Sequence, residues 1–149
     1  MEKRGKLRKL NHHKIQFLVL LLITSKISPT VQNLLQFRNF NNSEQVAIET
    51  LLRDLNVYKR KSMTFEKKEL EEDVLGATIM QYFDCYIELS PESLTETYFK
   101  PTVSHEIGHC FGLDHTKNQN DIMYFEAHDS QKYTDEDWET FRKQLNACF

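Results

Sequence analysis

The chain has few residues of the kinds that interrupt regular structure: four glycines and three prolines among 149 residues. Segments that link domains are usually rich in these residues, and the sequence also shows no internal repeat and no low-complexity tract. A chain of this length is long enough to bury a core without disulfide staples. We therefore expect one folded domain.

Cysteine is equally scarce. The three cysteines, Cys85, Cys110 and Cys148, are too few and too widely spaced for a disulfide framework, and they lack the paired spacing of a cysteine zinc site. Cys110 is interpreted as a small apolar residue buried on a helix. A Cys85–Cys148 bridge would be compatible with export, and the sequence does not decide whether it forms.

Positive charge is sparse outside the N-terminus. Residues 1–14 contain six of the 19 Lys and Arg residues, and the formal net charge of the whole chain is -3, so the remainder of the chain is acidic. A protein that binds nucleic acid needs a basic face. We therefore expect no nucleic-acid partner.

The basic start precedes a short apolar run at residues 15–23. This layout is typical of a secretory signal peptide, and the run falls short of the about 20 residues that a transmembrane helix needs, so no stable membrane anchor is expected. We interpret residues 1–28 as a signal peptide and 29–149 as the folded domain of a secreted or periplasmic protein. No clear cleavage site is visible. In the alternative interpretation the run is a buried strand of a cytoplasmic protein.

Local patterns in the remaining chain predict both helices and strands. Apolar residues at helical spacing follow a capping segment at 41–43, and Thr134 precedes an acidic first turn, which indicates helices over 44–55 and from 134 onward. A third helix is expected from Pro101 to Gly112. Short β-rich segments predict strands at 31–37, 62–65, 74–80 and 85–89. This order favours an α+β (mixed α/β) fold with a small sheet.

The segment from His105 to His115 reads HEIGHCFGLDH. Residues four apart lie on the same face of a helix, so His105 and His109 are expected to point at one position in space. Gly112 is suited to the left-handed conformation that ends a helix, which would bring His115 back toward the other two. Zinc in catalytic sites takes three protein ligands and a water. The pattern therefore predicts one zinc ion held by these histidines.

Glu106 follows the first of these histidines and lies about 100° around the helix from it. It would flank the metal without coordinating it, which suits a general base that activates water. His12 and His13 lie in the basic start, and His128 lies in a predicted loop. None of these three is expected to be a ligand.

The pattern H-E-x-x-H-x-x-G-x-x-H resembles the signature of the metzincin zinc peptidases. Asp121 to Tyr124 is similar to the methionine-containing turn of that group, with Met123 eight residues beyond His115 as in the matrixins. Thr116 is similar to the small hydroxyl residue that follows the third histidine in matrixins. The resemblance covers roughly residues 44–145, and it implies a metzincin-like zincin fold with an active-site helix and a C-terminal helix, so that 29–149 would be a catalytic domain.

The resemblance also implies a substrate site. Leu75 to Thr78 is similar to the edge strand along which matrixins bind an extended substrate, so Gly76, Ala77 and Thr78 are candidate substrate-binding residues. Tyr124, together with Phe125, would line the neighbouring specificity pocket. The implied function is a zinc-dependent endopeptidase that acts as a monomer on peptides or proteins.

Several features differ from vertebrate matrixins. No cysteine motif of the kind found in matrixin propeptides precedes the domain, and no histidine lies between His13 and His105 to hold a second, structural zinc. The loops are poor in glycine, so the sequence does not decide whether calcium binds. Phe125 stands where matrixins commonly have proline. Archaemetzincins share the core motif and carry additional cysteines, where this chain has Thr116 and Asp121. The alternatives to a matrixin-like enzyme are an archaemetzincin-like peptidase, a catalytically silent zinc-binding module, and an interaction or inhibitor protein that retains a peptidase fold.

Overall fold

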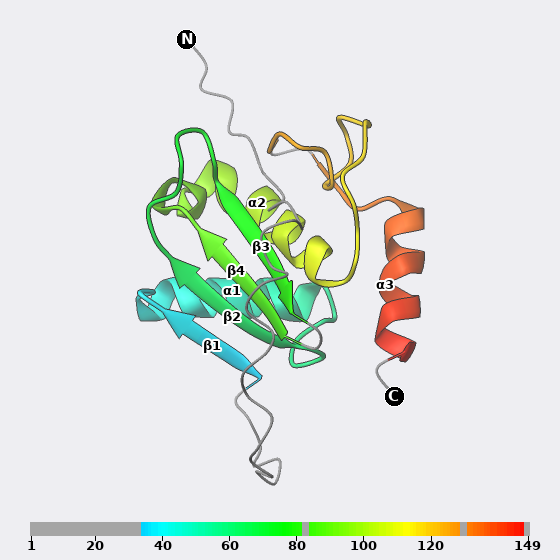
Figure 1. Ribbon diagram of the computed structural model, residues 1–149, viewed down its shortest axis with the longest axis horizontal. Coiled ribbons are helices and arrows are strands. Elements are labelled where there is room, and N and C mark those ends of the chain that lie inside the picture. Colours follow the sequence, from blue (N-terminus) through cyan, green and yellow to red (C-terminus); the bar gives the residue numbers. More distant parts are fainter. Residues whose placement is uncertain (1–33, 82–83, 129–130, 148–149) are drawn as a thin grey trace, which may run out of the picture.

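The computed structural model describes residues 34–81, 84–128 and 131–147 (Figure 1). The predicted signal peptide at 1–28 lies outside the described residues. The elements in chain order are β1 (Leu35–Arg38), α1 (Asn42–Asp54), β2 (Ser62–Lys67), β3 (Gly76–Gln81), β4 (Asp84–Leu89), the 3-10 helix η2 (Pro91–Leu94), α2 (Glu96–Cys110) and α3 (Asp135–Ala147). The α+β fold class predicted from the sequence is confirmed.

The four strands form one sheet in the order β1-β2-β4-β3. Strands β1, β2 and β4 run parallel, whereas β3 pairs antiparallel with β4, with Gly76 opposite Leu89 and Gln81 opposite Asp84. Strand β3 is therefore an edge strand, and it lies beside α2 in Figure 1.

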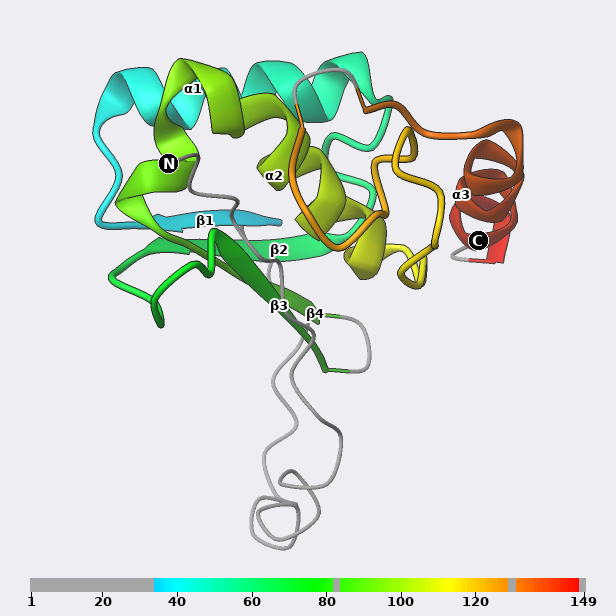
Figure 2. The same ribbon diagram turned by 90° about the horizontal axis from the view of Figure 1, so that it is seen from above.

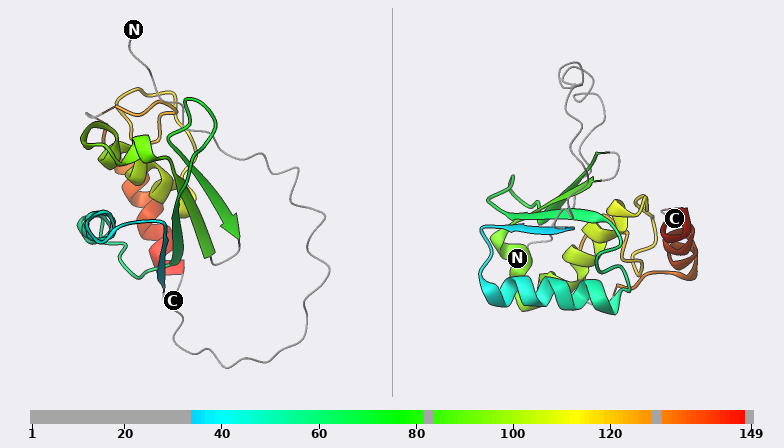
Figure 3. Two further views of the ribbon diagram at one scale, coloured as in Figure 1. Left: turned by 90° about the vertical axis from the view of Figure 1, so that its left-hand side faces the viewer. Right: turned by 90° about the horizontal axis from the view of Figure 1, so that it is seen from below.

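Helices α1 and α2 cover the same face of the sheet (Figure 2), as the view from the opposite side also shows (Figure 3). The alternation of buried residues along the strands explains this arrangement, because Met63, Phe65 and Ile87 are buried in the core formed with the helices. Helix α3 lies at one end of the domain, where the ring of Phe141 is 5.1 Å from that of Phe111.

Two helices begin at capping boxes. At the start of α1, Asn41 accepts a hydrogen bond from the backbone N–H of Glu44, and the Glu44 side chain accepts one from the backbone of Asn41. At the start of α3, the Thr134 hydroxyl accepts from the Asp137 N–H at 3.3 Å, and the Asp137 carboxylate accepts from the Thr134 N–H at 2.7 Å. These local contacts account for the agreement between the predicted and the observed starts of both helices.

Helix α2 begins earlier than predicted, at Glu96 and not at Pro101. The backbone N–H groups of Tyr98 and Phe99 both donate to the carbonyl of Thr95, and Phe99 packs against the core. Tertiary packing thus adds a turn ahead of the proline, although proline within a helix lacks the N–H that the helix would use.

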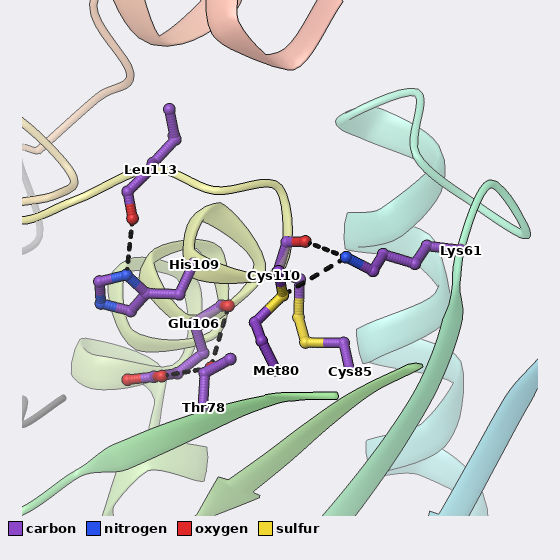
Figure 4. The surroundings of a disulfide bond; sticks show 8 residues. All are labelled: Lys61, Thr78, Met80, Cys85, Glu106, His109, Cys110 and Leu113. Carbon is purple, nitrogen blue, oxygen red and sulfur yellow. Dashed lines mark hydrogen bonds between the residues drawn. A yellow bond between two sulfur atoms is a disulfide. The ribbon is translucent and has the colours of Figure 1, made fainter. Parts of the chain in front are cut away.

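Cys110 is buried on a helix as predicted, but its pairing was not predicted. Cys110 forms a disulfide with Cys85, whose Cα lies 5.6 Å away, so Cys110 is not a free apolar residue and Cys85 is not available to Cys148. Both cysteines are buried, Cys85 on the helix-facing side of β4 and Cys110 at the end of α2. The bridge attaches helix α2 covalently to strand β4 of the sheet (Figure 4).

None of the helices in the described part of the chain has the length and the apolar character that crossing a bilayer requires.

Candidate active site

Three histidine side chains converge at the C-terminal end of α2. His105 and His109 lie one helical turn apart, and their Nε2 atoms are 3.0 Å from each other. The Nε2 atom of His115, which follows the helix, lies 3.0 Å from that of His105 and 3.2 Å from that of His109. His105 and His109 are buried, whereas His115 is exposed.

Gly112 turns the chain between the second and the third histidine. Its φ of 82° lies in the left-handed region, which favours glycine over residues with a Cβ. The N–H of Gly112 donates to the carbonyl of His109, and the N–H of Leu113 donates to the carbonyl of Gly108. These bonds close the end of the helix in the manner expected from the sequence.

The opposite ring nitrogens of the two helical histidines are held by backbone carbonyls. His105 Nδ1 lies 2.7 Å from the carbonyl of Ile122, and His109 Nδ1 lies 2.8 Å from that of Leu113. A carbonyl only accepts, so each Nδ1 carries the proton and each Nε2 keeps its lone pair. Burial, followed by the charge of His109, holds the pKa of His105 well below its usual value and favours the neutral ring.

This donor set fits a zinc ion. Three nitrogen ligands at 2.0–2.1 Å in a tetrahedral site lie about 3.3 Å from one another, close to the separations of 3.0 to 3.2 Å found here. Lone pairs on His105 and His109 face each other, which is repulsive unless a cation lies between them. The hydrogen bonds from the Nδ1 atoms of the two helical histidines to the carbonyls of Ile122 and Leu113 are of the kind that orients zinc-binding histidines. Among the described residues, these histidines form the one cluster able to hold a metal ion.

Glu106 lies beside this cluster with its side chain fully enclosed. It is 1% exposed, and Oε2 accepts a hydrogen bond of 2.6 Å from the hydroxyl of Thr78, whereas Oε1 has no hydrogen-bond partner. Burial raises the pKa of Glu106 to about 8, and the bond from Thr78 opposes this shift. A divalent cation nearby would favour the carboxylate. In Figure 4 the carboxylate and the His109 ring extend to the same side of α2.

The start of β3 lies against Glu106. A Cβ at Gly76 would lie 2.9 Å from both Cγ and Oε1 of Glu106, so only glycine leaves room for this side chain. Thr78, two residues along the strand, is 8% exposed and points its hydroxyl at the same carboxylate. Ala77 is also buried. The three β3 residues predicted to bind substrate are thus buried. Contact between their backbone and a substrate stays a prediction.

Met123 lies in the turn predicted from the sequence and is completely buried. The carboxylate of Asp121 accepts a bond of 2.8 Å from the Met123 N–H, and the Thr116 N–H donates to the Met123 carbonyl at 3.0 Å. The thioether occupies the space where a Cβ of Gly108 would stand. The close packing of Met123 against Gly108 was not predicted. The one feature of the sequence that could have indicated it is the presence of a glycine inside a helix.

Tyr124 and Phe125 follow the turn with their ring centroids 4.4 Å apart. Tyr124 is buried and Phe125 is 38% exposed, so of the two only Phe125 presents a large apolar surface to solvent. Their proposed place in a specificity pocket stays a prediction.

Tyr133 contacts helix α2 in a way that the sequence did not indicate. Its hydroxyl donates to the carbonyl of Ser104, which precedes His105 on α2, and its ring lies 5.0 Å from that of Phe141. Burial raises the pKa of Tyr133 well above its usual value, so the hydroxyl remains a donor. Tyr133 thereby joins the segment before α3 to the active-site helix.

The chain matches the model of a known protein family. The family model described as Matrixin matches residues 30–143, a span that includes every helix and strand from β1 to α2 and most of α3. No curated protein matches the chain.

Proposed function

The chain belongs to the matrixin family of zinc metallopeptidases, and on this premise we propose that it hydrolyses peptide bonds in protein substrates with Glu106 as the general base. The observation that carries the proposal is the convergence of three Nε2 atoms within 3.2 Å beside a buried carboxylate. His105, His109 and His115 would hold the zinc. When bound, zinc supplies Lewis acidity, which polarises a carbonyl and lowers the pKa of water.

The proton transfers belong to Glu106. Its unpartnered oxygen, Oε1, accepts a proton from the attacking water, and the resulting carboxyl group donates it to the amine nitrogen as the peptide C–N bond breaks. The enclosed position excludes bulk water from this exchange, because Glu106 is 1% exposed.

Strand β3 supports a binding mode for an extended substrate. It is an edge strand whose described pairing partner is β4, so the backbone on its other side is placed to pair with a substrate strand. Backbone pairing accepts many sequences, and side-chain selection would then fall to the region of Tyr124 and Phe125. We propose a peptide or protein substrate in extended form and a monomeric enzyme.

The alternatives differ in their use of Glu106. A silent zinc-binding module needs the histidines and has no need of a buried carboxylate beside them. Oε1 of Glu106 is buried without a hydrogen-bond partner, which is energetically unfavourable. Such unfavourable burial of a titratable group is typical of functional sites. An inhibitor with a retained fold would bind zinc and turn over no substrate. The match to the matrixin family gives no support to the inhibitor or to the archaemetzincin-like peptidase.

Zinc dependence is the direct test of the proposed function. Purified protein should contain about one zinc per chain, as three nitrogen ligands imply, and should cleave an unstructured protein such as reduced casein. A chelator should remove both the metal and the activity, and added zinc should restore both. Zinc at full occupancy without any cleavage would support the silent module instead.

We also propose that the protein acts outside the cytoplasm, with residues 1–28 removed on export. The Cys85–Cys110 disulfide supports this localisation, since structural disulfides persist mainly in oxidising compartments. N-terminal sequencing of protein recovered from the native host should begin close to residue 29. An intact Met1 on a cytoplasmic species, with Cys85 and Cys110 reduced, would contradict the localisation.

A further inference from the structure

Building on the proposed function, we propose that Thr78 is a positioning residue for the general base, and that it fixes one oxygen of Glu106 so that the other stays free to take a proton from the attacking water. The donor is the Thr78 hydroxyl, 2.6 Å from Oε2. Thr78 is 8% exposed and Glu106 is 1% exposed, so water does not compete freely for this bond.

The Thr78 hydroxyl has two acceptors and one proton. The carbonyl of Glu106 lies 3.1 Å from Oγ1, and Oε2 lies 0.5 Å closer, at 2.6 Å. A carboxylate is the stronger acceptor, and hydroxyl–carboxylate bonds of this length are among the strong ones in proteins. The proton is therefore directed mainly at Oε2. Thr78 consequently acts on the carboxylate and only secondarily on the helix backbone.

The two oxygens of Glu106 have different environments as a result. Oε2 is anchored, whereas Oε1 has no hydrogen-bond partner. A glutamate side chain rotates about three bonds and needs such an anchor to keep one orientation. With Oε2 held, rotation about the last bond is arrested, and Oε1 stays the oxygen that receives the proton.

Gly76 completes the arrangement from the same side of β3. Residues two apart on a strand share a face, and Gly76 leaves space for Cγ and Oε1 where any Cβ would lie 2.9 Å from them. Thr78 is opposite Ile87 in the ladder with β4, so its backbone is fixed by the sheet. Strand β3, which is proposed to bind the substrate, therefore also positions the Glu106 carboxylate. A substrate paired with β3 would then have a fixed position relative to the base.

This role differs from the substrate contact predicted for Thr78 by the resemblance. A side chain that touched the substrate would affect KM, whereas a side chain that orients the base affects kcat. A displacement of a catalytic group by about 1 Å can slow a reaction by about 100-fold.

The test compares Thr78→Val with Thr78→Ser. Valine keeps the shape and removes the donor, whereas serine keeps the donor and removes a methyl group. At equal zinc content, Thr78→Val should lower kcat by about 10- to 100-fold with KM little changed, and Thr78→Ser should retain most of kcat. Thr78→Val should cause no further loss in a Glu106→Gln background, because the base is already absent.

A second measurement needs no turnover. The infrared band of the Glu106 carboxyl group, identified in metal-free protein by its absence in Glu106→Gln, should shift in Thr78→Val and remain in place in Thr78→Ser. If Thr78→Val does not fold, Thr78→Ala against Thr78→Ser gives the same comparison. If the wild type cleaves nothing, the proposed function fails, and this band alone decides whether Thr78 holds Glu106.

Three results would overturn the role of Thr78. A raised KM at unchanged kcat would indicate a substrate contact. Equal losses in Thr78→Val and Thr78→Ser would indicate methyl packing. An unshifted infrared band in Thr78→Val would show that the hydroxyl does not bond the carboxyl group.

Discussion

Replacing Glu106 with glutamine should slow peptide cleavage by about 10²–10⁴-fold and leave the zinc content unchanged. The amide is nearly isosteric, and its oxygen still accepts the hydrogen bond from Thr78, which in the native protein is 2.6 Å long. What the change removes is the proton acceptor. Cleavage of a fluorogenic peptide at saturating substrate, together with metal analysis of the same sample, measures both quantities.

Two further variants make this result specific. Glu106→Asp keeps the carboxylate and withdraws it by one methylene, away from Thr78 and from the attacking water, so it should also be slow. Glu139→Gln is the matched control, since Glu139 is exposed on α3 and pairs with Lys143. Full activity of the Glu106→Gln variant at wild-type zinc content would mean that another residue is the base.

Replacing His109 with alanine should reduce bound zinc from about one per chain to nearly none, and activity should be lost with it. Two histidines remain, and catalytic zinc sites typically need three protein ligands. Metal analysis after dialysis against a weak chelator measures the loss. His128→Ala is the control for zinc content, because His128 is not part of the cluster formed by His105, His109 and His115.

The His109 variant also removes a buried ring, so a folding defect must be separated from a loss of ligand. His115→Ala serves this purpose, because His115 is exposed and its removal leaves no buried cavity. It should lose zinc while its circular dichroism stays that of the wild type. Retention of stoichiometric zinc by both variants would remove the basis of the proposed site.

The parts of the site that the sequence predicted are those set by local spacing. His105 and His109 face the same way because a helix repeats every 3.6 residues, and Gly112 marks the end of that helix. The caps at Asn41 and Thr134 are also local. Each of these features depends on a few consecutive residues and can be inferred without the tertiary structure.

The features that were missed depend on contacts between distant segments. The Cys85–Cys110 bridge spans 25 residues and depends on how α2 lies on β4. The bond from Thr78 to Glu106 depends on the register of β3 beside the same helix, across 28 residues. The family resemblance implied that β3 would meet the substrate, but it did not indicate that the Thr78 side chain would turn inward. The spacing of residues along the sequence does not indicate which distant side chains form a disulfide or a hydrogen bond.

Three of the four glycines in the chain lie at the active site. Gly76 leaves room for Glu106, Gly108 leaves room for Met123, and Gly112 takes a left-handed conformation. Every amino-acid change at a glycine adds a side chain, so at these positions even alanine is a disruptive substitution. In a saturation library these codons should tolerate fewer amino acids than the surrounding helix surface. The active site is thus vulnerable to mutation at residues that take no part in its chemistry.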